Sequence, residues 1–185
     1  MRAIAWALFL LLAAGALFLA PPSTRPGLVS DLMSLRGPDP ILVAIFQAMG
    51  LLPLFYARVL LRGLAHQRLT PWPFVLASFV VGGFVLLPAA ALRRYGSSTE
   101  ADPRWLRRFT EGRVVVVVLG FAAACLIVYA VGFGDLSTAV GIWRSDRFVF
   151  TYVLDFAVTL VGYPLVAGWE RRAAAQRRST AVRAN

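Results

Sequence analysis

Five apolar stretches constrain the fold of this 185-residue chain more than any other feature of its sequence. They run over residues 3–20, 41–61, 73–92, 114–133 and 148–169. A helix needs about 20 mostly apolar residues to cross a bilayer, and each stretch approaches that length. The sequence therefore predicts an all-α integral membrane protein: a single transmembrane domain over residues 1–185, built as a bundle of five transmembrane helices.

The first stretch has a second interpretation, as a cleaved secretory signal peptide, because Arg2 precedes it and Ala20 ends it. Its apolar core of 18 residues is longer than the usual ~7–15, however. The bulky Phe18 also stands where cleavage requires a small residue, and the proline pair 21–22 is suited to ending a helix. We expect the first helix to be retained, with a four-helix bundle as the alternative if it is removed.

Arginine supplies all 19 basic residues and gives the chain a net charge of +10. In a soluble protein this charge would suggest a nucleic-acid partner. Here the arginines gather at the ends of the apolar stretches, where they set orientation and bind anionic lipids. We therefore expect contacts with the lipid bilayer and with anionic lipids at the basic loops, and no nucleic acid.

No catalytic, metal or cofactor motif stands in the sequence. The single histidine, His66, cannot supply a zinc-binding histidine pair or the paired axial ligands of a membrane haem. Asp155 is the one acid deep within an apolar stretch, whereas an aspartyl intramembrane protease needs two. The absence of lysine excludes Schiff-base chemistry. We expect no catalytic, cofactor-binding or metal-binding residues, and a protein that is not an enzyme.

The arginine distribution predicts a topology for five crossings. The amino-terminal side would hold six arginines and the other side thirteen, and the richer side is normally cytoplasmic, or stromal in a plastid. This predicts N-out, C-in. The basic loop 93–113 and the basic tail 170–185 would then be cytoplasmic or stromal. The six arginines are Arg2, Arg58, Arg62, Arg68, Arg144 and Arg147.

Two loops and the tail carry further helical signals. The loop 21–40 predicts a short helical turn near Ser30–Leu35, and the spacing of the charges from Arg104 to Glu111 predicts a short amphipathic helix on the membrane surface. The tail is expected to extend the last helix for a few turns and then to fray into a disordered, solvated end. Ser78 and Gly82, four residues apart, predict a close helix–helix contact in the third span.

The fifth stretch carries a polar stripe that includes Asp155 and Thr159. A carboxylate at the depth of Asp155 costs ~2.5–3.5 kcal/mol unless it is paired, protonated or hydrated. Arg58, near the end of the second stretch, is the predicted partner, with hydrogen bonds from Tyr56, Tyr152 or Gln47. The predicted polar cluster is Asp155, Arg58, Tyr152, Gln47 and Thr159. It would either fix the register of the helices or form a functional site.

Several short segments resemble an uncharacterised family of multi-pass membrane proteins from cyanobacteria and chloroplasts. The most specific is Trp-Pro-Phe-Val-Leu-Ala-Ser-Phe at 72–79. The others are Ala-Pro-Pro at 20–22, Met-Gly-Leu-Leu-Pro-Leu at 49–54, Gly83, Leu-Pro at 87–88 and Tyr-Val-Leu-Asp-Phe at 152–156. The resemblance implies a location in a bacterial plasma membrane or a thylakoid membrane, and it implies no activity.

Two functions fit these features. The first is a non-catalytic accessory protein that assists assembly or stability of a larger membrane complex, including a photosynthetic one, or that forms a homo-oligomer. Small size and small-residue contact positions favour it. The alternative is a small oligomeric transporter or channel that uses Asp155, although the polar residues are few for a continuous path.

Overall fold

The computed structural model describes residues 2–67 and 69–184. Over these residues the chain is 79% helical and contains no strand, as predicted. Four helices are long and apolar enough to cross a membrane. They are α1 (Arg2–Ala14, continued by a π-helical turn at Gly15–Leu19), α3 (Pro40–Leu60), α7 (Arg113–Phe133) and α9 (Arg147–Ala184).

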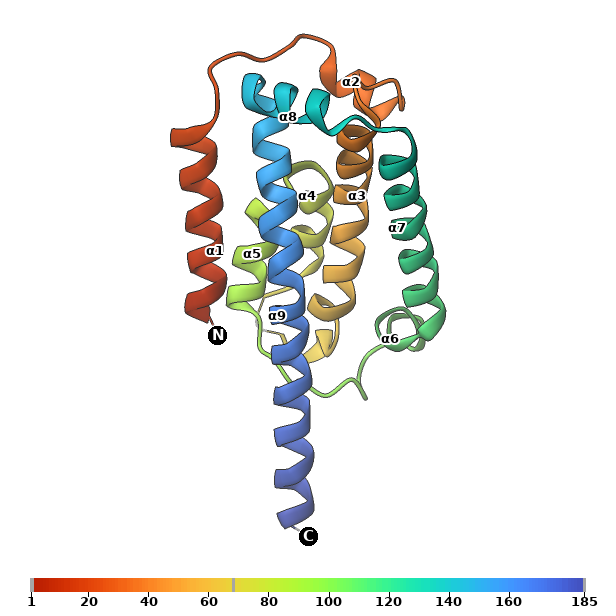
Figure 1. Cartoon of the computed structure of the whole chain (residues 1–185). Helices are drawn as coiled ribbons and strands as arrows, with labels where there is room; N and C mark the ends of the chain where they lie inside the picture. The colour runs from red at the N-terminus through yellow and green to blue at the C-terminus, as the bar shows by residue number, and fades with distance from the viewer. Residues whose placement is uncertain (1, 68, 185) are drawn as a thin grey trace.

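The predicted third span is not one helix. Residues 72–92 form two helices of ten residues each, α4 (Trp72–Val81) and α5 (Gly83–Leu92). Ten residues rise about 15 Å, roughly half of a bilayer core. Figure 1 shows α4 running into the bundle and α5 returning to the end from which α4 entered. The expectation of a fifth spanning helix is therefore corrected to a helical hairpin that enters and leaves at one end.

The hairpin turns at Gly82, whose backbone angles are φ 65° and ψ −137°. L-residues with a side chain rarely adopt a positive φ, so the turn depends on glycine. Hydropathy does not register this break, because both flanking helices are apolar.

Both described chain ends lie at the same end of the bundle (Figure 1). We call this end the base; it also carries residues 61–67, 69–71 and 93–112. Four long helices and a returning hairpin bring the chain back to the end of the bundle at which it starts. The N-out, C-in orientation, which assumed five crossings, stays a prediction.

Short helices cover both ends of the bundle (Figure 1). α2 (Leu28–Met33) and α8 (Leu136–Ser145) lie opposite the base, and α6 (Arg104–Glu111) lies at the base. The structure thus confirms the short helix predicted near residues 30–35 and the helix predicted over residues 104–111. α9 continues through the tail to Ala184, which confirms the predicted extension of the last helix; the predicted frayed end is not seen over the described residues.

α3 is the central helix: α4, α7 and α9 all pack on it, while α1 packs mainly on α5. Near the base, Tyr56, Leu60 and Leu86 belong to one buried cluster. Leu42 and Val149 belong to another, toward the opposite end. α5 therefore lies inside the bundle, between α1, α3 and α9, whereas α4 packs on α3 and α5 and leaves Leu76, Phe79 and Val80 exposed.

Candidate functional site

The hairpin turn meets a buried carboxyl group. Asp155 is 2% exposed, and its two oxygens accept hydrogen bonds from the backbone N–H of Gly83 at 2.9 and 3.1 Å. The Thr159 hydroxyl, one helical turn further along α9, donates to the same carboxyl group at 3.1 Å. Gly83 is the first residue of α5, so its N–H has no acceptor within the helix. We call Asp155, Thr159 and Gly83 the tip cluster.

Glycine at the turn lets the carboxyl group approach the backbone. A Cβ atom at Gly82 would overlap the Asp155 carboxylate, and one at Gly83 would overlap both Asp155 and the Thr159 hydroxyl. The first turn of a helix carries partial positive charge, which favours a carboxyl group at this place. The tip cluster therefore holds α5 against α9 through the backbone of the turn itself.

Arg58 is not part of this cluster, and the predicted Asp155–Arg58 ion pair is absent from the structure. The Arg58 guanidinium instead donates hydrogen bonds to the carbonyl oxygens of Phe109, Thr110 and Gly112, at 3.0–3.1 Å. These carbonyls end α6, where helical carbonyl groups lack partners. Arg58 thus fastens α6 to α3 at the base, far from the carboxyl group it was expected to neutralise.

Of the other predicted cluster members, the structure brings only Thr159 to Asp155. The Tyr152 hydroxyl donates to the Leu42 carbonyl at 3.1 Å, and the Gln47 side chain donates to the Leu32 carbonyl at 3.1 Å. Tyr56, a further predicted donor, bonds to the Thr159 carbonyl at 2.9 Å. Each of these side chains links two helices by donating to a backbone carbonyl. From sequence spacing alone, this role looks the same as membership of one shared polar site.

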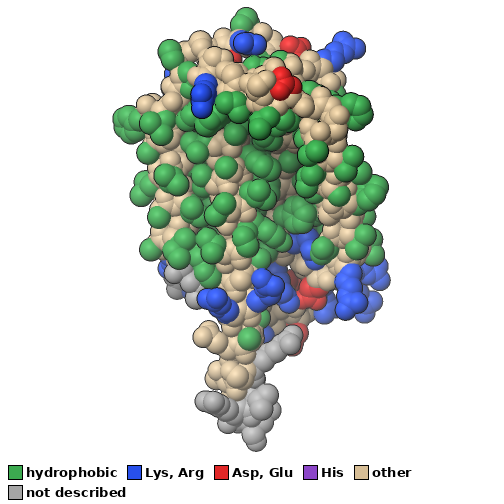
Figure 2. All heavy atoms as spheres, in the orientation of Figure 1, with side chains coloured by type: hydrophobic (Ala, Val, Ile, Leu, Met, Phe, Trp, Pro, Cys, Tyr) green, Lys and Arg blue, Asp and Glu red, His purple; other side chains and the backbone are tan. Residues whose placement is uncertain are grey.

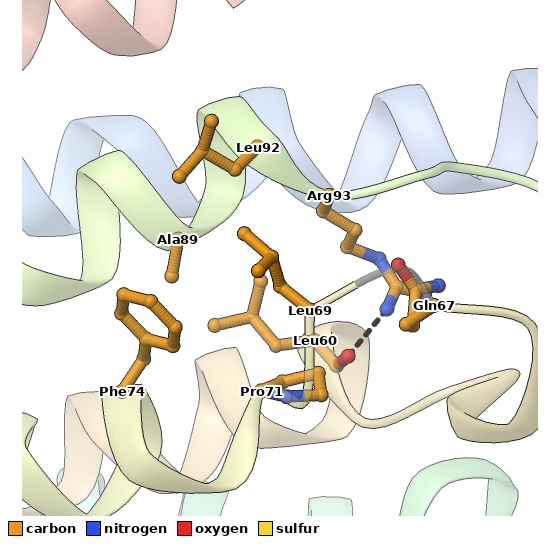
Figure 3. Close-up of a pocket in the computed structure, with 8 residues that line it drawn as sticks. All are labelled: Leu60, Gln67, Leu69, Pro71, Phe74, Ala89, Leu92 and Arg93. Carbon is orange, nitrogen blue, oxygen red and sulfur yellow. Dashed lines mark hydrogen bonds between the residues drawn. The ribbon is translucent and has the colours of Figure 1, made fainter.

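A buried ion pair closes the other end of the hairpin. Arg93 and Glu170 are 5% and 3% exposed, and their side chains meet at 3.2 Å. Arg93 also donates to the carbonyl oxygens of Leu60 and Arg62, the first of which is drawn in Figure 3. The N–H of Gly96 donates to Glu170 at 3.2 Å. We call Arg93 and Glu170 the basal ion pair.

Sequence reasoning missed this pair, although the signal for it was present. Arg93 directly follows the third apolar stretch and Glu170 directly follows the fifth. The predicted topology placed both positions on one side. Arg93 joins the end of α5 to the end of α3, because its guanidinium has enough donors for a carboxylate and two carbonyls.

A lateral groove lies between α7 and α9, with α3 as its floor. Its volume is about 280 Å³, and its lining is apolar. Four of the lining residues are alanines: Ala44 and Ala48 on α3, and Ala123 and Ala130 on α7. Figure 2 shows hydrophobic side chains across this face of the bundle and basic side chains gathered below it.

α7 borders the groove and is the least buried of the four long helices. Leu119 is its one buried residue. Small residues on a helix let a second helix approach closely, which is the main source of helix association in lipid.

Within residues 2–67 and 69–184, no three His, Cys, Asp or Glu side chains gather closely enough to hold a metal ion. Comparison of the chain with protein-family models, curated proteins and solved structures gives no match.

Proposed function

We propose that the protein is a non-catalytic integral membrane accessory protein that binds one transmembrane helix of a larger membrane complex and assists its assembly or stability. The observation that carries this proposal is the apolar lateral groove between α7 and α9. An apolar groove with two alanines on α3 and two on α7 among larger apolar side chains suits the packing of a further helix. The resemblance noted above adds a plasma or thylakoid membrane to the proposal as its location.

We further infer that the base faces the cytoplasm or stroma. Of the arginines whose side chains the structure describes, twelve lie at the base and four at the opposite end. The four are Arg25, Arg36, Arg144 and Arg147. This asymmetry is stronger than the thirteen against six expected for five crossings. It supports both termini inside, with anionic lipids at the basic base.

Site-specific photo-crosslinking tests the groove in native membranes. A photoreactive residue in place of Leu160, which lines the groove, should give one discrete adduct. The same residue in place of Val128, which is 68% exposed and lies outside the groove, should not. Filling the groove with Ala48→Phe should abolish the Leu160 adduct, while Val128→Phe leaves it unchanged.

The identity of the adduct decides between partners. A different membrane protein supports the accessory role, and a second copy of this chain identifies a homo-oligomer instead. Equal labelling from Leu160 and Val128 would contradict a specific groove partner, because it is the pattern of a helix that faces only lipid.

Transport is the second candidate function, and the broken helix at Gly82 favours it. Transporter sites are built at helices interrupted near the bilayer midplane, with half-helix ends facing the bound ion or substrate. The tip cluster shares one feature with such sites: Asp155 accepts a hydrogen bond at the first turn of α5, next to the interruption between two short helices. In this proposal an oligomer supplies the remainder of the path.

Ion or proton flux into proteoliposomes tests this candidate. Flux carried by the wild type and abolished by Asp155→Asn would favour transport over docking. Thr151→Val, at an exposed hydroxyl on the same helix, provides the control and should leave flux unchanged. Absence of flux with the wild type, at a protein density that gives oligomers, would count against transport.

A further inference from the structure

A second cavity opens at the base, separate from the lateral groove. Its volume is about 610 Å³, and we call it the base cleft. Four segments form it: the start of α1, the loop after α3 at His66, the loop after α5 and the extension of α9. These segments lie at the same end of the molecule in Figure 1.

The lining of the base cleft is strongly cationic. Arg2, Arg94 and Arg177 each come from a different one of these segments, and all three side chains are exposed. Among the residues that the structure describes, none of the three forms an ion pair with a carboxylate. Arg93 also lines the cleft, but its charge is offset by Glu170. Three positive charges therefore converge on one hollow without a counter-ion from the described chain.

The loop that carries Arg94 is held in place by the body of the protein. The backbone N–H of Gly96 donates to Glu170, and Gly96, at φ 73°, packs against the backbone of Ala173 on α9. The side chain of Gln67 bonds to both the N–H and the carbonyl of Arg94, at 3.1 and 3.0 Å. A fixed loop places its charge and its donors without an ordering cost on binding.

Hydroxyl groups lie beside the arginines. Ser98 lines the cleft, and so does Ser97, whose hydroxyl donates to the Arg94 carbonyl at 3.3 Å. Guanidinium groups bind phosphate oxygens through paired, charge-assisted hydrogen bonds, and hydroxyls bind them as single donors. A cleft of this volume exceeds the size of one phosphate and has room for a phosphate carried on a larger group.

We propose that the base cleft binds a phosphate-bearing anion through Arg2, Arg94 and Arg177. The favoured source is the headgroup of an anionic phospholipid, because the cleft opens at the end of the apolar helices, where headgroups lie. Free phosphate has the same chemistry and is the other source. The cleft and the lateral groove share no lining residue, so this proposal stands or fails independently of the docking proposal.

Binding is measured on the full chain purified in a mild neutral detergent. Titration with a short-chain phosphatidic acid should raise the thermal midpoint of unfolding, and native mass spectrometry should show the lipid retained. Short-chain phosphatidylcholine should have no effect, because its choline cancels the charge. In the variant Arg94→Gln/Arg177→Gln we expect affinity for phosphatidic acid to fall about tenfold or more, since two charge-assisted contacts are lost.

The matched control removes the same charge elsewhere at the base. Arg104→Gln/Arg108→Gln alters two exposed arginines of α6 that do not line the cleft, and it should bind phosphatidic acid as the wild type does. If inorganic phosphate stabilises the wild type as strongly as the lipid, free phosphate is the ligand. The proposal is overturned if neither probe binds, or if both double variants lose affinity equally, which would indicate only a diffuse basic surface.

Discussion

The two ends of the α4–α5 hairpin solve the same problem in different ways. At the tip, the buried Asp155 accepts hydrogen bonds from a backbone N–H and a hydroxyl, and none of the arginines that the structure describes forms an ion pair with it. At the base, the equally buried Glu170 is paired with the guanidinium of Arg93. A carboxyl group within the bundle is thus accommodated by the interrupted helix itself, while one at the base uses a counter-charge.

This difference carries a lesson about intramembrane acids. A search for the partner of a buried carboxyl group usually looks for a cation. A helix that starts inside the bundle offers unpaired N–H groups and a partial positive charge, so the carboxyl group needs no second charged side chain beside it. The two arrangements should therefore respond differently to substitution.

The largest effect is expected at the base. Arg93→Met leaves Glu170 buried without its cation and removes the donor to the carbonyls of Leu60 and Arg62. Breaking a buried pair on one side costs about 3–5 kcal/mol. Urea or thermal unfolding in detergent should show a loss of this size. Arg93→Met/Glu170→Met should recover much of it; a double variant as unstable as the single one would contradict the role of the ion pair.

The next largest effect is expected at the tip. Gly83→Ala introduces a methyl group that overlaps Thr159 and Asp155. We expect a loss of about 1–3 kcal/mol from overpacking, increased by a weakened Gly83 hydrogen bond. Gly120→Ala on α7 is the control, because a Cβ there meets nothing within 4 Å. Equal stability of the two variants in the same unfolding assay would show that the tip is not closely packed.

Two substitutions of Asp155 should show whether the tip needs a hydrogen-bond acceptor or a negative charge at this position. Asp155→Asn keeps an acceptor for the Gly83 N–H and should cost no more than ~1 kcal/mol, the size of one hydrogen bond. Asp155→Leu leaves that N–H unsatisfied and should cost about 1–3 kcal/mol. Unfolding free energies of the two variants provide the measurement. An Asn variant as damaged as the Leu variant would show that the tip requires a negative charge after all.

The smallest effect concerns an exposed acid opposite the base. The Thr138 and Ser137 side chains donate hydrogen bonds to Asp135, which lower its pKa from 3.8 to about 2. A pKa lower in the folded than in the unfolded state means that the stabilisation is complete above pH ~4 and disappears as pH falls toward 2. The thermal midpoints of the wild type and Asp135→Ala should differ slightly at pH 6 and converge near pH 2. A difference that grows in acid would contradict this sign.

The helices themselves were largely predictable from the sequence. Four apolar stretches correspond to α1, α3, α7 and α9, because length and hydropathy suffice to define long helices. The charge spacing of residues 104–111 also located α6. In both cases the signal lies within the segment itself and needs no knowledge of its partners.

The hairpin and its partners were not predictable in the same way. Gly82 was interpreted as a packing position with Ser78, because an apolar stretch of twenty residues gives no sign of where its backbone turns. That single change reverses the direction of the chain and brings both termini to one end. The partner of Asp155 was missed for a related reason: a backbone N–H becomes available only when the helix is known to begin at Gly83.

The separation of Gly83 and Asp155 along the chain also bears on how the protein is made. Asp155 follows Gly83 by 72 residues, and α9 is the last helix to be synthesised. At ~5–20 residues per second, a ribosome needs about 4–14 s to produce that segment. During this interval the nascent hairpin has no acceptor for its turn, so its final placement follows translation of α9, and factors that shield it have several seconds in which to act.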